Sequence, residues 1–261
     1  MQVSIFSIIF MAISAIISIS LPIFLFIFLH KKYDAKILPL IIGAVAFIIF
    51  ALILERIVHS IVYKNFSLRE KPLLFIFYAP FMAGIFEETA RFISFKILKK
   101  KFTGISTGLS YGIGHGGIES VLLAGFSMMA GLVFSILINT GNIEIITDKL
   151  QGETLDQLNI QLSTISTTPS YMFLLSGVER IFAISIQISL SVIVFYSVFC
   201  NNKLWLFPLA IILHAIIDFS PAAFQVGIIK NILLVYILLC ISATIMVILT
   251  IYLHKKLKEK L

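Results

Sequence analysis

Long apolar stretches separated by short polar ones set the pattern of this chain. Seven of them are long enough to cross a hydrocarbon core of about 30 Å at about 1.5 Å per helical residue. Apolar runs of this length predict transmembrane helices, so we expect an all-α, polytopic transmembrane helical bundle. The predicted spans, within a single integral membrane domain covering residues 1–261, lie near residues 3–29, 37–63, 73–98, 104–138, 171–199, 204–225 and 231–253.

Two of the seven segments have features of their own. The first has no charged region before it and no small-residue cleavage site, and it is long for a signal peptide. It is therefore predicted to be a retained helix. The fourth is overlong and rich in glycine, which predicts a helix that is broken, tilted or split around the sequence GIGHGG.

Composition supports the membrane assignment. Hydrophobic residues make up 59% of the chain and charged residues 13%, and the charged share is about half that of soluble globular proteins. A water-soluble fold with this composition would leave large apolar patches exposed. The formal net charge of +7 therefore reflects membrane topology, and we expect no nucleic-acid partner. Cys200 and Cys240 lie in apolar segments without a CxxC pattern, so we expect small buried side chains and no disulfide.

The basic residues predict the orientation, because cytoplasmic loops carry an excess of lysine and arginine. With the N-terminus outside, the outer side receives Lys64, Arg69, Lys71, Lys149 and Lys230. The cytoplasmic side then receives Lys31, Lys32, Lys36, Lys96, Lys99, Lys100, Lys101, Lys203, Lys255, Lys256, Lys258 and Lys260. This excess predicts an N-out/C-in, multi-pass protein of the cell membrane.

One polar loop and the residue usage add to this expectation. Residues 139–168 form the one long polar segment, which we expect to be an acidic extracytoplasmic loop with room for a short surface helix. The composition rich in isoleucine, phenylalanine and lysine indicates an AT-rich bacterial genome. We therefore expect the bacterial cytoplasmic membrane as the location.

Ionisable residues inside the spans carry the candidate chemistry, because each is costly in a bilayer unless it faces a protein interior or a water-filled cavity. Several recur at helical spacing, which places them on one helix face. Counted from the cytoplasmic lysines, they lie at a shared depth of roughly 16–21 Å. The sets of the third, fourth and sixth segments are Glu87, Glu88 and Arg91; His115 and Glu119; and His214 and Asp218.

Two further charged sets are predicted to play lesser roles. Glu179 and Arg180 in the fifth segment are adjacent, so at most one of them faces a cavity, and we expect this pair to support a site more than to act in it. Glu55, Arg56 and His59 lie near the outer end of the second segment, where a charged side chain costs little free energy because water is close. For these three we expect a structural role.

Hydrolysis of a peptide bond inside a membrane requires a water to be held and deprotonated and an oxyanion to be stabilised. A glutamate beside a histidine can do the first, and a second histidine with a polar neighbour can do the second. The same midplane carboxylates and histidines also occur in proton- or ion-coupled transporters, and a non-catalytic membrane scaffold is a third reading. The chain shows no internal repeat of the kind common in transporters, which favours the protease.

Four motifs in this order resemble the YhfC family of intramembrane proteases, which is related to the CAAX-processing and bacteriocin-processing proteases. They are EETAR (87–91), GHGGIE (114–119), ERIFAI (179–184) and HAIID (214–218). The resemblance extends from the second segment onward. It implies an intramembrane endopeptidase acting on a membrane-embedded or membrane-associated peptide or protein in the lipid bilayer.

The resemblance also implies roles for individual residues. Glu87 would be the general base that activates water, with His115 holding the same water. Glu88 and Arg91 would form a structural or substrate-orienting ion pair, and His214 with Asp218 the oxyanion-stabilising side.

The chain departs from the broader superfamily at two points. Its double glutamate stands two residues from the arginine instead of three, which leaves open whether Glu87 or Glu88 faces the water. Glu119 is an additional carboxylate. We expect no cofactor, and the alternative is a divalent metal such as zinc held by His115, His214, Glu88 and Glu119, although the chain has no HExxH motif.

Overall fold

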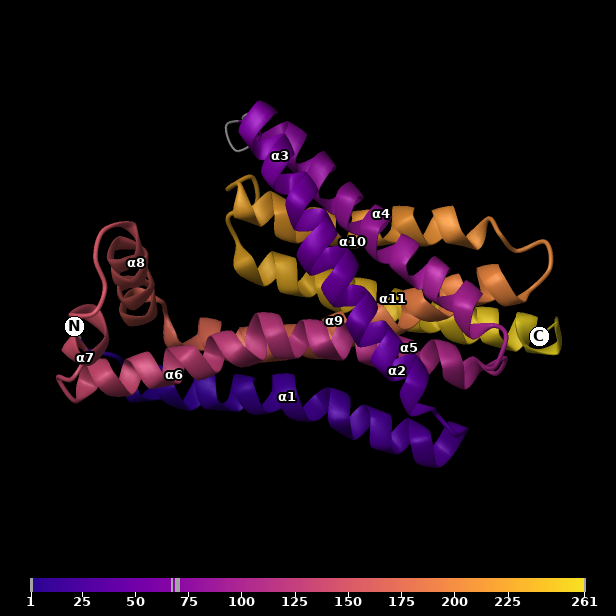
Figure 1. The fold of residues 1–261 in the computed structure, drawn as a ribbon, viewed down its shortest axis with the longest axis horizontal. Coiled ribbons are helices and arrows are strands. Elements are labelled where there is room, and N and C mark those ends of the chain that lie inside the picture. The colour runs from indigo at the N-terminus through magenta and orange to yellow at the C-terminus, as the bar shows by residue number, and fades with distance from the viewer. Residues whose placement is uncertain (1, 67, 69–70, 261) are drawn as a thin grey trace. The chain divides into compact units, whose positions relative to one another are not determined.

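A computed structural model describes residues 2–66, 68 and 71–260 of the chain, and all regular elements among these residues are helices. Seven helices within this described part of the chain are long and apolar enough to cross a membrane, which confirms the predicted all-α, seven-span fold (Figure 1). Five of the spans are single helices: α1 (Ile5–Tyr33), α4 (Pro72–Leu98), α9 (Ser170–Phe199), α10 (Leu206–Gln225) and α11 (Ile232–Leu257). The second comprises α2 (Ile37–Phe47), η1 (Ile48–Glu55) and α3 (Arg56–Phe66), and the fourth comprises α5 (Ile105–Glu119), η3 (Ser120–Gly125) and α6 (Phe126–Asn139).

The fourth span is not split at GIGHGG, because helix α5 runs through that sequence without a break. The irregularity lies just after it, where η3 is a π-helical stretch, and a second π-helical stretch, η1, ends at Glu55. Widened turns of this kind occur often at functional sites.

The predicted helix in the 139–168 segment is found as α8 (Glu153–Thr167), preceded by the short α7 (Glu144–Thr147). The N-out/C-in orientation stays a prediction. Arg69, one of the basic residues counted for it, lies outside the described residues.

The chain divides into two compact units. The first consists of Met1–Leu21 and Ser120–Ile181, and the second of Pro22–Glu119 and Phe182–Leu261. In the first unit, the start of α1 is tied to the end of α6, because the Asn139 side chain accepts a hydrogen bond from the Val3 amide at 2.8 Å and donates one to the Val3 carbonyl at 2.9 Å. The prediction of a single domain over residues 1–261 stays a prediction.

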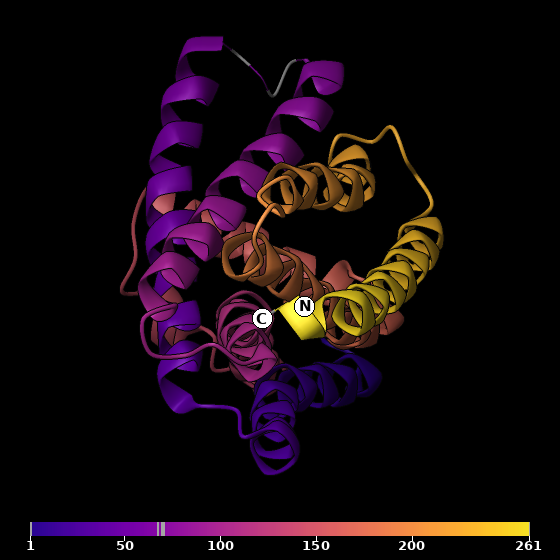
Figure 2. The same ribbon diagram turned by 90° about the vertical axis from the view of Figure 1, so that its right-hand side faces the viewer.

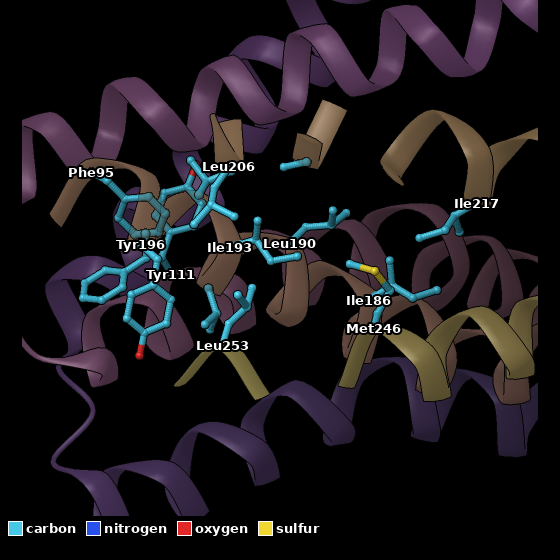
Figure 3. Packing of buried hydrophobic residues seen from close by; sticks show 14 of the residues in the cluster. Phe95, Tyr111, Ile186, Leu190, Ile193, Tyr196, Leu206, Ile217, Met246 and Leu253 are labelled. Atoms are coloured by element: carbon cyan, nitrogen blue, oxygen red, sulfur yellow. The ribbon is translucent and has the colours of Figure 1, made fainter. Parts of the chain in front are cut away.

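In the second unit, η1 and α3 turn back into α4 as a hairpin whose arms run side by side (Figure 2), and α4 also packs along α10. The core holds a cluster of fully buried side chains that includes Phe95, Tyr111 and Phe195 (Figure 3 shows the first two). The ring centroids of Phe95 and Tyr111 lie 4.8 Å apart, and those of Phe95 and Phe195 lie 5.9 Å apart. Large apolar side chains such as Phe77, 65% exposed, cover the outside, as a protein surface in contact with lipid requires.

Two glycines let α2 and α5 approach closely. A Cβ atom at Gly114 would collide with the carbonyl oxygen of Leu40, and one at Gly43 would collide with that of Tyr111. The added Cβ at Gly43 would also lie 3.0 Å from the backbone nitrogen of His115. Since only glycine avoids these backbone clashes, the glycines place His115 at its depth in the bundle.

Replacing Gly114 with Ala is expected to lower the free energy of unfolding by about 1–3 kcal/mol, because backbone atoms cannot yield as a flexible side chain can. Gly104→Ala is the matched control, since its added Cβ would meet nothing closer than the Ser106 hydroxyl at 3.5 Å. Denaturant unfolding of both variants in detergent measures the difference. Equal stability of the two variants would contradict the close packing of α2 against α5.

Candidate active site

The predicted site residues of the second unit come from three helices, and the structure brings them together. Helix α4 contributes Glu87, Glu88 and Arg91, which project toward each other because they stand three and four residues apart. Helix α5 contributes His115 and Glu119, and helix α10 contributes His214 and Asp218.

Arg91 is the most heavily bonded side chain of the group, and it is fully buried. Its Nη1 lies 2.5 Å from Glu88 Oε1, and its Nη2 lies 3.4 Å from Glu87 Oε2. Its Nε donates to the Ser191 hydroxyl at 3.1 Å, and Nη2 also donates to Gln187 Oε1. A buried guanidinium is tolerated where carboxylates and hydrogen-bond acceptors surround it, so Arg91 fixes the positions of both glutamates.

The two glutamates differ in exposure and in partners. Glu87 keeps 8% of its surface exposed, whereas Glu88 is completely buried. Glu87 Oε2 lies 2.8 Å from His115 Nε2 and 3.2 Å from Gln187 Nε2, and both nitrogens can donate to it. Within the described chain, all hydrogen bonds and ion pairs of Glu87 use Oε2 and none uses Oε1.

The ring of His115 is fixed by packing as well as by Glu87. Phe47 meets it edge-on with ring centroids 5.1 Å apart, and Tyr111 stacks on it at 5.9 Å. His115 is completely buried. Its Nε2–H is therefore directed at Glu87 and cannot swing away without displacing two aromatic rings.

His214 faces carboxylates at both ring nitrogens. Its Nδ1 lies 2.7 Å from Glu88 Oε1, and its Nε2 lies 3.3 Å from Asp218 Oδ2 and 4.0 Å from Glu87 Oε2. The Asp218 side chain is 38% exposed, against 10% for Glu87 and 4% for His214. Glu88 thus anchors one side of the imidazole, and the other side points to the region shared by Glu87 and Asp218.

Gln187 and Ser191 on α9 belong to this site, although the sequence reasoning missed them. Gln187 accepts from Arg91, donates to Glu87, and donates to Glu119 Oε2 at 2.7 Å. Glu119 therefore joins the group through Gln187. The signal in the sequence was a single amide within an otherwise apolar and serine-containing stretch, and a search restricted to ionisable residues passes over it.

The two lesser charged sets have different outcomes. Glu179 and Arg180 belong to the first unit and form an ion pair with each other. Glu55 lies in the second unit and is only 7% exposed, and its place near a membrane interface stays a prediction. The helix is continuous to Phe66, which places Glu55 about 16 Å before its end at 1.5 Å per residue.

Two comparisons with known proteins identify the family of this chain. The sequence pattern of the YhfC intramembrane metalloprotease family matches residues 17–239. The chain is also 35% identical over 246 residues to the uncharacterized membrane protein YhfC of Bacillus subtilis (strain 168), covering 92% of this chain and 94% of that protein. This chain belongs to the YhfC intramembrane metalloprotease family. No solved structure matches it. Membership in the YhfC family, together with the seven apolar helices, makes it a multi-pass cell-membrane protein of an intramembrane protease family.

The name of the YhfC family implies a metal ion, and the ligand types fit one, since zinc accepts histidine and carboxylate. The geometry does not fit. Among the described residues, no three His, Cys, Asp or Glu side chains form a group that could hold a metal. His115 Nδ1 and Glu88 Oε2 are buried atoms without a hydrogen-bond partner, but a structural or catalytic zinc takes three or four protein ligands. The Arg91 guanidinium already provides the positive charge between Glu87 and Glu88.

Proposed function

We propose that this chain is an intramembrane endopeptidase of the glutamate type, in which Glu87 activates the water that attacks a peptide bond. One observation carries the proposal: Glu87 is held on Oε2 by His115, Gln187 and Arg91, while Oε1 remains available on a carboxylate that is 8% exposed. A general base must be fixed in orientation and still present one oxygen to water. Glu88, completely buried and bound to Arg91 and His214, is less suited to that role.

In the proposed reaction, Glu87 Oε1 takes a proton from water as the water oxygen bonds to the scissile carbonyl carbon. His115 keeps the carboxylate oriented through its bond to Oε2. The carbonyl oxygen becomes an oxyanion, and Glu87 then delivers its proton to the leaving nitrogen as the C–N bond breaks. Protons balance, because the one taken from water leaves with the amine.

His214 is the group proposed to stabilise the oxyanion. Its Nε2 lies 4.0 Å from Glu87 Oε2, so a substrate carbonyl carbon beside the attacking water would bring its oxygen within reach of that nitrogen. Glu88 holds the opposite ring nitrogen, and Asp218 steadies Nε2 from the more exposed side. Donors fixed before the reaction need no reorganisation when charge develops.

The proposed substrate is a membrane-embedded or membrane-associated protein or peptide. The site lies within helices whose outward side chains are apolar, so a substrate would come from the bilayer or its surface. The test uses the purified protein in liposomes together with detergent-solubilised bacterial membrane proteins as the probe. Labelling of newly formed N-termini, followed by mass spectrometry, should reveal cleavage products that are missing when the protein is left out. Absence of new N-termini at several protein ratios would contradict the proposal.

A further inference from the structure

The two sides of the proposed site along the helix axes differ in chemistry. Toward the end of α4 at Leu98, a closely packed group of aromatic side chains lies next to the site, together with buried hydroxyls such as those of Ser94 and Ser110. Phe95, Tyr111 and Phe195 are completely buried and in ring contact, and Phe47 is 2% exposed against His115 (Figure 3 shows Phe95 and Tyr111). Close-packed apolar side chains of this kind leave little room for water. This side of the site is closed.

Toward the other end, where α3 ends and α4 begins, a second polar cluster lies in the bundle. His59 Nε2 lies 3.0 Å from Glu55 Oε1, and His59 Nδ1 lies 3.1 Å from the Tyr78 hydroxyl. We call Glu55, His59 and Tyr78 the hairpin cluster, since they come from the α3–α4 hairpin. Tyr63 extends it, with its ring 5.3 Å from His59 and 6.2 Å from Tyr78.

The hairpin cluster lies between the site and the helix ends. Tyr78 precedes Glu87 by nine residues on α4, about 13 Å along the helix. Glu55 is near enough to interact electrostatically with both Glu87 and His214. The side chains of Glu55 and His59 are 10% and 18% exposed, so they are enclosed by protein but not sealed.

A hydrolase inside a bilayer needs water at its catalytic base, and hydrocarbon carries almost none. Water can follow a line of side chains that offer hydrogen bonds, because each polar group replaces part of the hydration that the water loses. The hairpin cluster is such a line on the open side, and the Asp218 side chain is 38% exposed. The closed side also holds polar groups, such as the Tyr196 hydroxyl that lies 2.6 Å from His254 Nδ1, but no buried carboxylate lies there among the described residues.

We propose that water reaches Glu87 from the α3–α4 end of the second unit, along Tyr78, His59 and Glu55. The inference rests on the proposed function, since it gives the hairpin cluster the task of supplying the water of hydrolysis. In the N-out/C-in orientation expected from the lysines, this end is the extracytoplasmic one. The second π-helical stretch, η1, ends at Glu55 and places its carboxylate on this route.

Cysteine accessibility tests the route without any need for proteolysis. In a Cys200→Ala/Cys240→Ala background, single cysteines are introduced at Tyr78 and His59, and the protein is placed in liposomes. A charged, membrane-impermeant methanethiosulfonate reagent reports water, because it reacts with the thiolate. Phe77→Cys is the matched control at the same depth, since Phe77 neighbours Tyr78 in sequence but is 65% exposed on the outside. Ser94→Cys, a conservative change at a 6% exposed position, probes the closed side.

Cysteines at Tyr78 and His59 are expected to react at least about tenfold faster than those at Phe77 and Ser94. A Ser94 cysteine that reacts as fast as the Tyr78 cysteine would overturn the route, and so would equal rates at Tyr78 and Phe77. The readout is independent of catalysis. A fast Tyr78 cysteine in a protein that forms no new N-termini would leave the route standing and reject the proposed function instead.

The reaction provides a second readout that a purely structural role would not change. His59→Leu is expected to lower kcat about tenfold or more with little change in KM, because it removes both hydrogen bonds of the imidazole. His59→Gln, which can still donate and accept, is expected to recover most of kcat. Equal kcat in the wild type and His59→Leu would count against the route.

Discussion

Glu87→Gln is expected to reduce the cleavage rate by about 10²–10⁴-fold while the protein remains folded. The amide can still accept the hydrogen bond from His115 and has nearly the same volume, but it cannot take a proton from water. Formation of new N-termini from solubilised membrane proteins, measured for variant and wild type at equal concentration in liposomes, gives the ratio. Unfolding in denaturant, measured on the same samples, shows whether the fold is retained.

Glu153→Gln on α8 is the control for this variant, since it makes the same chemical change on an exposed residue of the first unit. It should cleave at the wild-type rate. If Glu87→Gln also cleaves within twofold of the wild type, Glu87 is not the base. That result would favour the alternative function, a proton- or ion-coupled transporter that uses these residues.

Arg91→Met is expected to lower the free energy of unfolding by about 3–5 kcal/mol, the largest stability effect in the second unit. The substitution leaves the Glu87 and Glu88 carboxylates buried without their shared cation, and it also removes the donors to Ser191 and Gln187. Denaturant unfolding in detergent measures the loss. Arg56→Met, the same change at an exposed position of α3, should cost much less.

The double variant Arg91→Met/Glu88→Gln separates charge pairing from packing. Neutralising Glu88 removes one of the two unpaired charges, so the double variant should be more stable than Arg91→Met alone. If it is less stable, with the two losses simply adding, then the ion pair between Arg91 and Glu88 makes no net contribution. The network around Arg91 would then stabilise the fold through packing and not through charge pairing.

The spans could be predicted from the sequence because the apolar length of a segment is a local property. The third segment was expected at residues 73–98 and is found at Pro72–Leu98, with its proline in the first turn, where the missing N–H costs nothing. The fourth was expected at 104–138 and is found at Ile105–Asn139. The π-helical stretch after GIGHGG could not be predicted, because the glycines of that sequence serve close contacts with neighbouring helices and do not break α5.

Helical spacing in the sequence predicted the contacts of the site that form within a single helix. Glu87, Glu88 and Arg91 meet because residues three and four apart share a helix face, and His214 meets Asp218 for the same reason. Contacts between helices depend on register, which a single sequence does not reveal. The pairing of His115 with Glu87 was therefore expected only from the family resemblance, and that of His214 with Glu88 appears only in the structure.

Two residues show where reasoning from charge alone falls short. Gln187 carries no charge, yet its amide contacts Glu87, Arg91 and Glu119, because an amide both donates and accepts. Glu55 was expected near an interface because it lies toward the outer end of the second segment. It is buried because α4 packs along this part of the second span.

A cleavage assay after exhaustive chelation tests most directly whether Glu87 and its neighbours activate water without a metal ion. Metal content is measured by mass spectrometry on the same purified sample in detergent. The account predicts that new N-termini form at an undiminished rate with far less than one metal ion per chain. Loss of cleavage on chelation that is restored by zinc, together with loss of the metal in His115→Ala/His214→Ala, would contradict it.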